Sequence, residues 1–191
     1  LNVITTKTRP DTSVYKTIKS ISNNAVQAAR GNSGIIFAQF LTGLFHKMKN
    51  KSHMTTIDFS LNVKNAVHYL YNNIEDPVEG TMLTVMNDWA EKMHESARKV
   101  DDFVLLFKES LISARESLEK TKNGLKVLKK MNIVDAGAQG FVFFIEGMLN
   151  YLNEHSQSIV GKTVNIKKID LELEEIEHID DFDNEIKYRY C

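Results

Sequence analysis

The chain has 191 residues and a net charge of −1, with 42% apolar and 26% charged residues. This balance excludes a chain that is disordered throughout, because it can bury enough apolar surface to offset the entropy lost on folding. The near-zero charge gives no indication of a nucleic acid or an anionic membrane as partner. Two prolines and nine glycines are too few turn residues for an all-β sandwich, so long helices are expected.

The first half of the chain predicts four helices, because its apolar residues recur at helical spacing. Residues 12–29 and 35–48 carry apolar stripes, and a break with two glycines separates them over residues 30–34. A third helix is predicted over residues 56–74 and a fourth over residues 80–98.

The second half predicts three more helices. A fifth begins at Asp101-Asp102, where two acidic residues complement the helix dipole. A short sixth covers residues 124–131, and a seventh contains residues 141–152. Short loops make consecutive helices antiparallel neighbours. The predicted fold is therefore all-α, an up-and-down antiparallel helical bundle or barrel.

The C-terminal tail differs in composition from the helices. Residues 165–191 contain four basic and nine acidic residues, a net charge of −5 against +4 for the rest. Apolar residues from Val164 to Leu173 alternate roughly with polar ones, which predicts a strand or an extended linker. We expect a helical domain over residues 1–160, and over 161–191 an extended acidic linker with the start of a following domain.

The compartment is predicted to be cytoplasmic. A single cysteine excludes an internal disulfide framework and a zinc site made only of cysteines, and a reducing environment is expected. No apolar run approaches the roughly 18 residues of a membrane span. The start LNVITTKTRP lacks a basic region followed by an apolar run, so no signal peptide is predicted. Both ends resemble cuts through a longer protein.

Three breaks in the helical pattern share small residues placed immediately before a helix. They are Gly31-Asn32-Ser33-Gly34, Glu79-Gly80-Thr81-Met82 and Asp135-Ala136-Gly137-Ala138-Gln139-Gly140. A helix N-terminus offers unpaired N–H groups and a partial positive charge, and glycine lets ligand oxygens approach closely. Ser33 and Thr81 would add hydroxyl donors. The same residues would also suit plain caps and tight turns, and helix parity alone does not establish that the breaks meet.

Other common site patterns are absent. The six histidines form no pair with zinc-protease spacing, and the sequence contains neither a GxxxxGK[ST] phosphate loop nor a GxGxxG turn. His178 and Cys191 both lie in the acidic tail, but two ligands are fewer than a zinc site needs.

Together the three breaks resemble the kinase subunit of bacterial fatty acid kinase. The segment AARGNSGII over residues 28–36 is similar to GARGNSGVI of that family, and PVEGTMLTV over residues 77–85 to its PVEGTILTV. Residues 134–141 resemble its VDAGGQGLV, with Ala138 in place of the usual second glycine. The ordered match covers about residues 12–153.

The resemblance implies a barrel of about eight helices, the fold of the L domain of dihydroxyacetone kinases, with ATP or ADP bound at one end. It implies that phosphates contact Asn32, Ser33 and Gly34, and that Gly80, Thr81, Met82, Asp135, Ala136 and Gly137 line the nucleotide. It also implies a separate DegV-type fatty-acid carrier as partner, an acyl phosphate as product, and a homodimer formed through the full-length protein.

One departure concerns magnesium. The family reads LNVFPVPDGDTGTNM, and those aspartates bind the Mg²⁺ ions of ATP. Here Leu1-Asn2-Val3 matches, but Ile4 follows. Either a segment is missing between Val3 and Ile4, or a genuine deletion leaves a kinase fold without its metal loop.

The ending IKYRYC resembles the family's GYC segment, with Arg189 replacing the glycine. In relatives that cysteine, here Cys191, contributes to a metal site.

Two classes of function remain open. The leading interpretation is the ATP-binding domain of a fatty acid kinase, which the PVEGT and VDAG forms favour. The runner-up within the same fold is a dihydroxyacetone-kinase-like subunit. The other class is a degenerate, non-catalytic nucleotide-binding or scaffold domain, which would be nearly inactive because phosphoryl transfer depends on charge neutralisation by metal.

Overall fold

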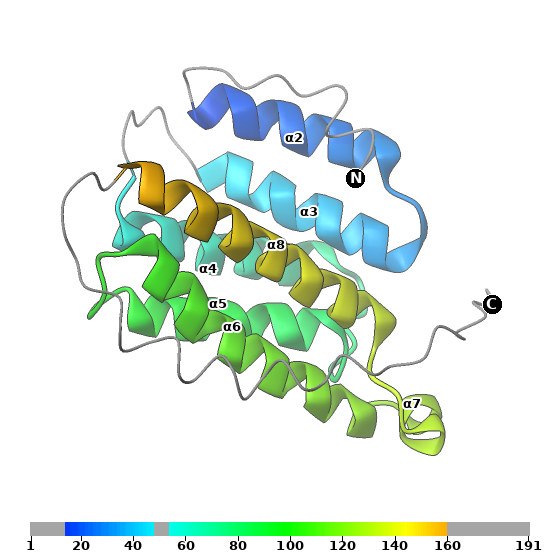
Figure 1. Cartoon of the computed structure of the whole chain (residues 1–191). Helices are drawn as coiled ribbons and strands as arrows, with labels where there is room; N and C mark the ends of the chain where they lie inside the picture. The colour runs from blue at the N-terminus through cyan, green and yellow to red at the C-terminus, as the bar shows by residue number, and fades with distance from the viewer. Residues whose placement is uncertain (1–13, 48–53, 160–191) are drawn as a thin grey trace. The chain divides into compact units, whose positions relative to one another are not determined.

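The described part of the computed structural model comprises residues 14–47 and 54–159, and all its secondary structure is helical (Figure 1). This confirms the predicted all-α class. The predicted strand or linker of the tail lies outside the described residues. The elements are α2 (Val14–Ala28), α3 (Gly31–Lys47), α4 (Thr56–Asn73), α5 (Met82–Ser96), α6 (Phe103–Lys120), the 3₁₀ helix η1 (Thr121–Asn123), α7 (Lys126–Met131) and α8 (Ala136–Ile159).

Two helices begin earlier than the apolar pattern predicts. Helix α3 begins at Gly31 instead of Ile35, and α8 begins at Ala136, before the apolar stripe of residues 141–152. The N–H groups of a first helical turn have no intrahelical partner, so small polar residues fit there without an apolar stripe. Two of the three breaks are therefore themselves the first turns of long helices.

Five of the α-helices, α3, α4, α5, α6 and α8, close into an antiparallel barrel, and α2 packs outside this ring against α3. Contacts join α2 to α3, α3 to α4, α4 to α5 and α5 to α6. Helix α8 closes the ring between α3 and α6: the Phe37 and Phe144 rings are 4.9 Å apart, and Arg115 Nη2 lies 2.9 Å from Glu146 Oε1. Chain contacts divide the protein into Leu1–Ser156 and Gln157–Cys191, and the barrel belongs to the first unit.

Aromatic side chains from three different helices fill the centre of the barrel. Phe40 of α3, Trp89 of α5 and Phe141 of α8 are each 1% exposed. Their ring centroids are 5.3–6.3 Å apart in edge-to-face arrangements. Burying each such side chain stabilises the fold by about 1.5–3 kcal/mol. The three helices that carry the breaks are thus held together by the same core cluster.

Helices α3, α5 and α8 all begin at the same end of the barrel (Figure 1). The reason is the length of α7, which has six residues and spans about 9 Å, too little to cross the barrel. Helix α8 therefore starts at the end where α6 finishes and runs antiparallel to it. No helix in the described ranges has both the length and the apolarity needed to cross a membrane.

Candidate functional site

The first and third breaks touch each other directly. A Cβ atom built on Gly137, in the first turn of α8, would lie 2.5 Å from Ser33 Oγ and 3.2 Å from Ser33 Cβ. Only a residue without a side chain allows Ser33 to approach α8 this closely. The N-termini of α3 and α8 are therefore adjacent.

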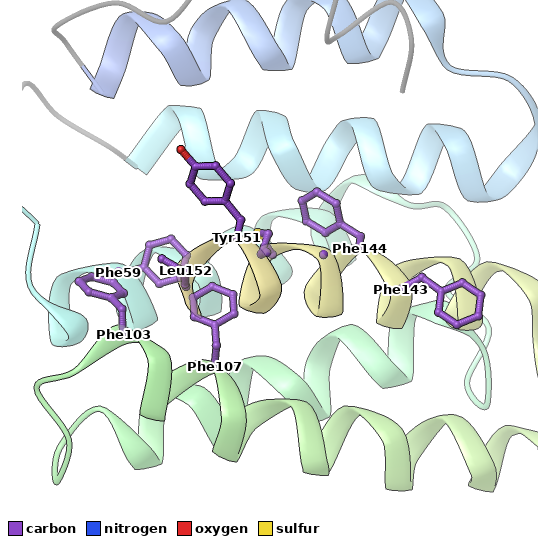
Figure 2. A pocket seen from close by; sticks show the side chains of 9 residues that line it. Phe59, Phe103, Phe107, Phe143, Phe144, Tyr151 and Leu152 are labelled. Atoms are coloured by element: carbon purple, nitrogen blue, oxygen red, sulfur yellow. The ribbon is translucent and has the colours of Figure 1, made fainter. Parts of the chain in front are cut away.

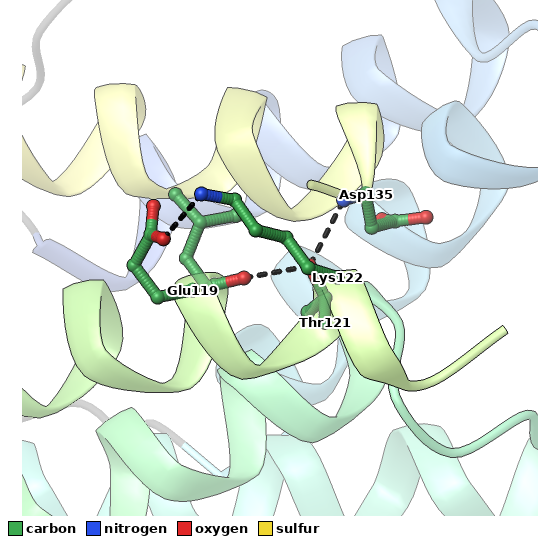
Figure 3. A network of polar contacts seen from close by, with 5 residues as sticks. Glu119, Thr121, Lys122 and Asp135 are labelled. Carbon is green, nitrogen blue, oxygen red and sulfur yellow. Dashed lines mark hydrogen bonds and ion pairs between the residues drawn. The ribbon is translucent and has the colours of Figure 1, made fainter. Parts of the chain in front are cut away.

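The 3₁₀ helix η1 connects the second break to the third. Thr121 Oγ1 accepts a 2.9 Å hydrogen bond from the Asp135 N–H and donates to the Leu118 carbonyl at 2.6 Å (Figure 3). On the other side, a Cβ on Gly80 would lie 2.6 Å from Gly124 Cα. The structure thus brings all three breaks to one end of the barrel, with η1 between two of them.

The helix ends at this site keep backbone donors available. Thr81 is the N-cap of α5, no side chain caps that end, and the first backbone bond there runs from the Val85 N–H to the Thr81 carbonyl at 3.3 Å. At α8 the Asp135 carboxylate accepts one N–H, that of Ala138, at 2.8 Å. The three N-termini together concentrate partial positive charge at one place, an arrangement that suits an anion such as a phosphate.

The side chains that the sequence indicated differ in whether their hydrogen-bonding groups are already used within the fold. Asn32 and Ser33 are exposed, and neither side chain makes a hydrogen bond within the described ranges. Thr81 Oγ1 already donates to the Val78 carbonyl at 2.6 Å, so its proton is committed. The Met82 side chain is 4% exposed in the core, which leaves only its backbone for the site. Asp135 serves as the cap of α8.

Residues that the sequence did not indicate also shape the site. Thr121 is 1% exposed, and its hydroxyl is what joins η1 to α8. Tyr71 of α4 donates to Glu79 Oε1 at 3.3 Å, and Glu79 also accepts from Thr84. Thr121 and Tyr71 lie outside the motifs, whereas Glu79 and Thr84 belong to the PVEGTMLTV segment, and only the folded chain shows which contacts these side chains make. Burial, followed by the nearby Glu79 carboxylate, raises the pKa of Tyr71 to about 12.

The described residues offer no metal centre: within residues 14–47 and 54–159 no three His, Cys, Asp or Glu side chains gather in a way that could hold an ion. The expected aspartate loop between Val3 and Ile4 lies outside these ranges, as do His178 and Cys191. Magnesium binding by the aspartate loop and metal binding by Cys191 therefore stay predictions.

A separate apolar groove of about 680 Å³ opens between α4, α6 and α8 (Figure 2). Its walls include Phe59, Phe103 and Phe107, and no charged side chain lines it. Tyr151, one of the α8 residues that line it, is about 22 Å along the helix from Ala136. The groove is lined by apolar side chains, and the helix that begins at it, α6, is capped by the Asp102 carboxylate, so the groove does not suit a phosphate.

Removing the Thr121 hydroxyl should destabilise the site. Thr121→Val keeps the shape but leaves the Asp135 N–H without its acceptor, and we expect the free energy of unfolding to fall by about 1–3 kcal/mol. Thr121→Ser retains the hydroxyl and is the matched control. Urea denaturation followed by circular dichroism measures both, and equal losses for the two variants would show that the hydrogen bond does not matter.

A family model described as the DAK2 domain matches residues 3–150. An uncharacterized protein of Staphylococcus haemolyticus (strain JCSC1435) is 32% identical over 179 residues, which are 91% of this chain and 31% of that protein. Uncharacterized proteins of Staphylococcus aureus strains bovine RF122 / ET3-1 and MRSA252 are each 33% identical over 180 residues, with the same coverage. The chain thus spans 31% of the length of these curated relatives.

Proposed function

This chain belongs to the DAK2 domain family, the L-type domain of dihydroxyacetone kinases, and from that premise we propose that it binds ATP or ADP where α3, α5 and α8 begin. The family as a whole is one of kinase-like nucleotide-binding domains. The observation that carries the proposal is the meeting of three helix N-termini, with Gly137 against Ser33 and η1 between the second and third breaks.

The proposed phosphate contacts follow from which donors remain available. Asn32, Ser33 and Gly34 supply exposed side-chain and backbone donors at the start of α3. At the start of α5, Gly80, Thr81 and Met82 would act through the backbone, because the Thr81 hydroxyl and the Met82 side chain are used elsewhere. Asp135, Ala136 and Gly137 line the third side, where small side chains permit close approach.

The finer proposal is an ATP-dependent fatty acid kinase domain in the cytoplasm. A separate DegV-type carrier would present the fatty acid, and the product would be an acyl phosphate. The PVEGT and VDAG forms of the second and third breaks support this branch over a dihydroxyacetone-kinase-like subunit. A homodimer would form through the full-length protein. The competing class is a non-catalytic nucleotide-binding domain.

Magnesium separates the kinase from the non-catalytic domain. When bound to ATP, Mg²⁺ neutralises charge on the phosphates. The described residues do not fit a magnesium site, because no three His, Cys, Asp or Glu side chains gather among them in a way that could hold an ion. The proposal therefore assigns no step to the metal, and the aspartate loop implied by the family would have to supply its ligands.

Calorimetric titration tests the proposal. We expect ATP and ADP to bind this chain at one saturable site. At a ligand concentration one hundred times Kd, the free energy of unfolding should rise by about 2.7 kcal/mol. Titrations with and without Mg²⁺ show whether the chain holds the metal. Failure of both nucleotides to bind in either condition would contradict the proposed site.

Turnover distinguishes the candidate functions. Phosphate transfer from ATP to a fatty acid held by a DegV-type carrier supports the fatty acid kinase. Transfer to dihydroxyacetone bound by its own partner supports the alternative. Nucleotide binding with neither transfer assigns this chain to the non-catalytic class.

A further inference from the structure

We propose that Tyr71 is a positioning residue for the candidate nucleotide site, acting through Glu79 and Thr84 to hold the turn at Gly80 from which α5 begins. The inference rests on the proposed function and extends it to a residue that lies in α4, outside all three breaks. The Tyr71 hydroxyl would not touch the nucleotide, and its effect would pass through the backbone of the second break.

A directed chain of hydrogen bonds connects Tyr71 to that backbone. The Tyr71 hydroxyl donates to Glu79 Oε1 at 3.3 Å. The Thr84 hydroxyl donates to the other carboxylate oxygen, Oε2, and accepts from the Gly80 N–H at 2.8 Å. Each hydroxyl uses its single proton once, and the carboxylate only accepts, so the chain is consistent from α4 to the turn.

The hydrogen-bond chain holds a turn whose backbone conformation and close packing suit only glycine. Gly80 has a φ of 75°, and its backbone packs against Gly124 so closely that neither residue has room for a side chain. Glu79 itself is exposed, so without partners its carboxylate would sample many positions in water. Hydrogen bonds to a carboxylate are stronger than those between neutral groups, and two such bonds restrict it.

The hydrogen-bond chain also decides which donors of α5 remain for a ligand. It uses the Gly80 N–H and the Thr84 hydroxyl, whereas no side chain caps the N–H groups of the first turn of α5. The Tyr71 hydroxyl is protonated, and thus a donor, at neutral pH, as any tyrosine with a pKa of about 10 would be. Burial and the neighbouring Glu79 and Asp88 carboxylates raise its pKa further, to about 12. Tyr71 therefore acts as a permanent anchor on a neighbouring helix.

Two pairs of substitutions test the inference through ADP affinity measured by calorimetry on the whole chain. Tyr71→Phe removes only the hydroxyl and should weaken ADP binding about threefold to tenfold, while Tyr151→Phe on the distant groove should leave it unchanged. Thr84→Val should weaken binding similarly, while Thr84→Ser, which keeps the hydroxyl, should restore it. Melting temperatures are recorded for every variant.

The outcomes separate the inference from the proposed function. If the wild-type chain does not bind ADP, the proposed function fails and this inference fails with it. If the wild-type chain binds and Tyr71→Phe binds equally well, only the inference is overturned. A lowered melting temperature with unchanged affinity would likewise show that Tyr71 serves stability alone.

Discussion

Ser33→Ala should weaken ATP binding about ten- to a hundredfold, because a hydrogen bond to a charged group contributes about 1.5–3 kcal/mol. Ser33 is exposed beside Gly137, and its hydroxyl makes no hydrogen bond within the described ranges. The substitution should therefore leave the melting temperature nearly unchanged. Titration of ATP with Mg²⁺ against both proteins, in a chain that retains the aspartate loop, measures the difference. Equal affinities with a lower melting temperature would mean that Ser33 only caps α3.

Two alanine substitutions in α8 test the Ser33 contact from the other side, one that disturbs it and one that serves as the control. Gly137→Ala places a Cβ within 2.5 Å of Ser33 Oγ, so it should displace the hydroxyl and also reduce ATP affinity. Gly140→Ala meets nothing within 4 Å and should raise helix stability by about 0.5–1 kcal/mol without changing affinity. Loss of affinity in both variants would point to a general disturbance of α8 instead of a specific contact.

Gly80→Ala should cause a large loss of stability, about 2–4 kcal/mol in the free energy of unfolding. Gly80 has a φ of 75°, which L-residues rarely adopt, and its Cβ would lie 2.6 Å from Gly124 Cα. The atoms nearest to that Cβ are all backbone atoms of Gly124, so no side chain can turn away to make room. Urea denaturation measures the change, and nucleotide affinity should fall with it because the start of α5 must move.

Gly31→Ala separates the two causes of the stability lost in Gly80→Ala, which are the positive φ and the close contact with Gly124. Gly31 has a φ of 65° but nothing within 4 Å of its Cβ position, so its substitution carries the backbone strain alone, about 1–2 kcal/mol. The difference between the two variants then reports the close approach of Gly80 to Gly124. If Gly80→Ala proves no more harmful than Gly31→Ala, the contact between the second break and the segment after η1 is not tight in solution.

Some features of this protein follow from local patterns, which a sequence carries directly. The spacing of apolar residues determines that the chain is helical and roughly where each helix lies. Small residues before three helices indicate sites where backbone N–H groups are accessible, because that property depends on the first helical turn alone. Helix boundaries were predicted less well at α3 and α8, since their first turns need no apolar stripe.

Other features depend on residues distant in the sequence and were decided only by the tertiary structure. Whether three helices begin at the same end depends on α7 being too short to cross the barrel, which a count of helices does not reveal. The contacts of Gly137 with Ser33, of Gly80 with Gly124 and of Thr121 with Asp135 arise when separate helix ends pack together. Pattern and spacing describe one element at a time, so the site that these contacts assemble exists only in the closed barrel.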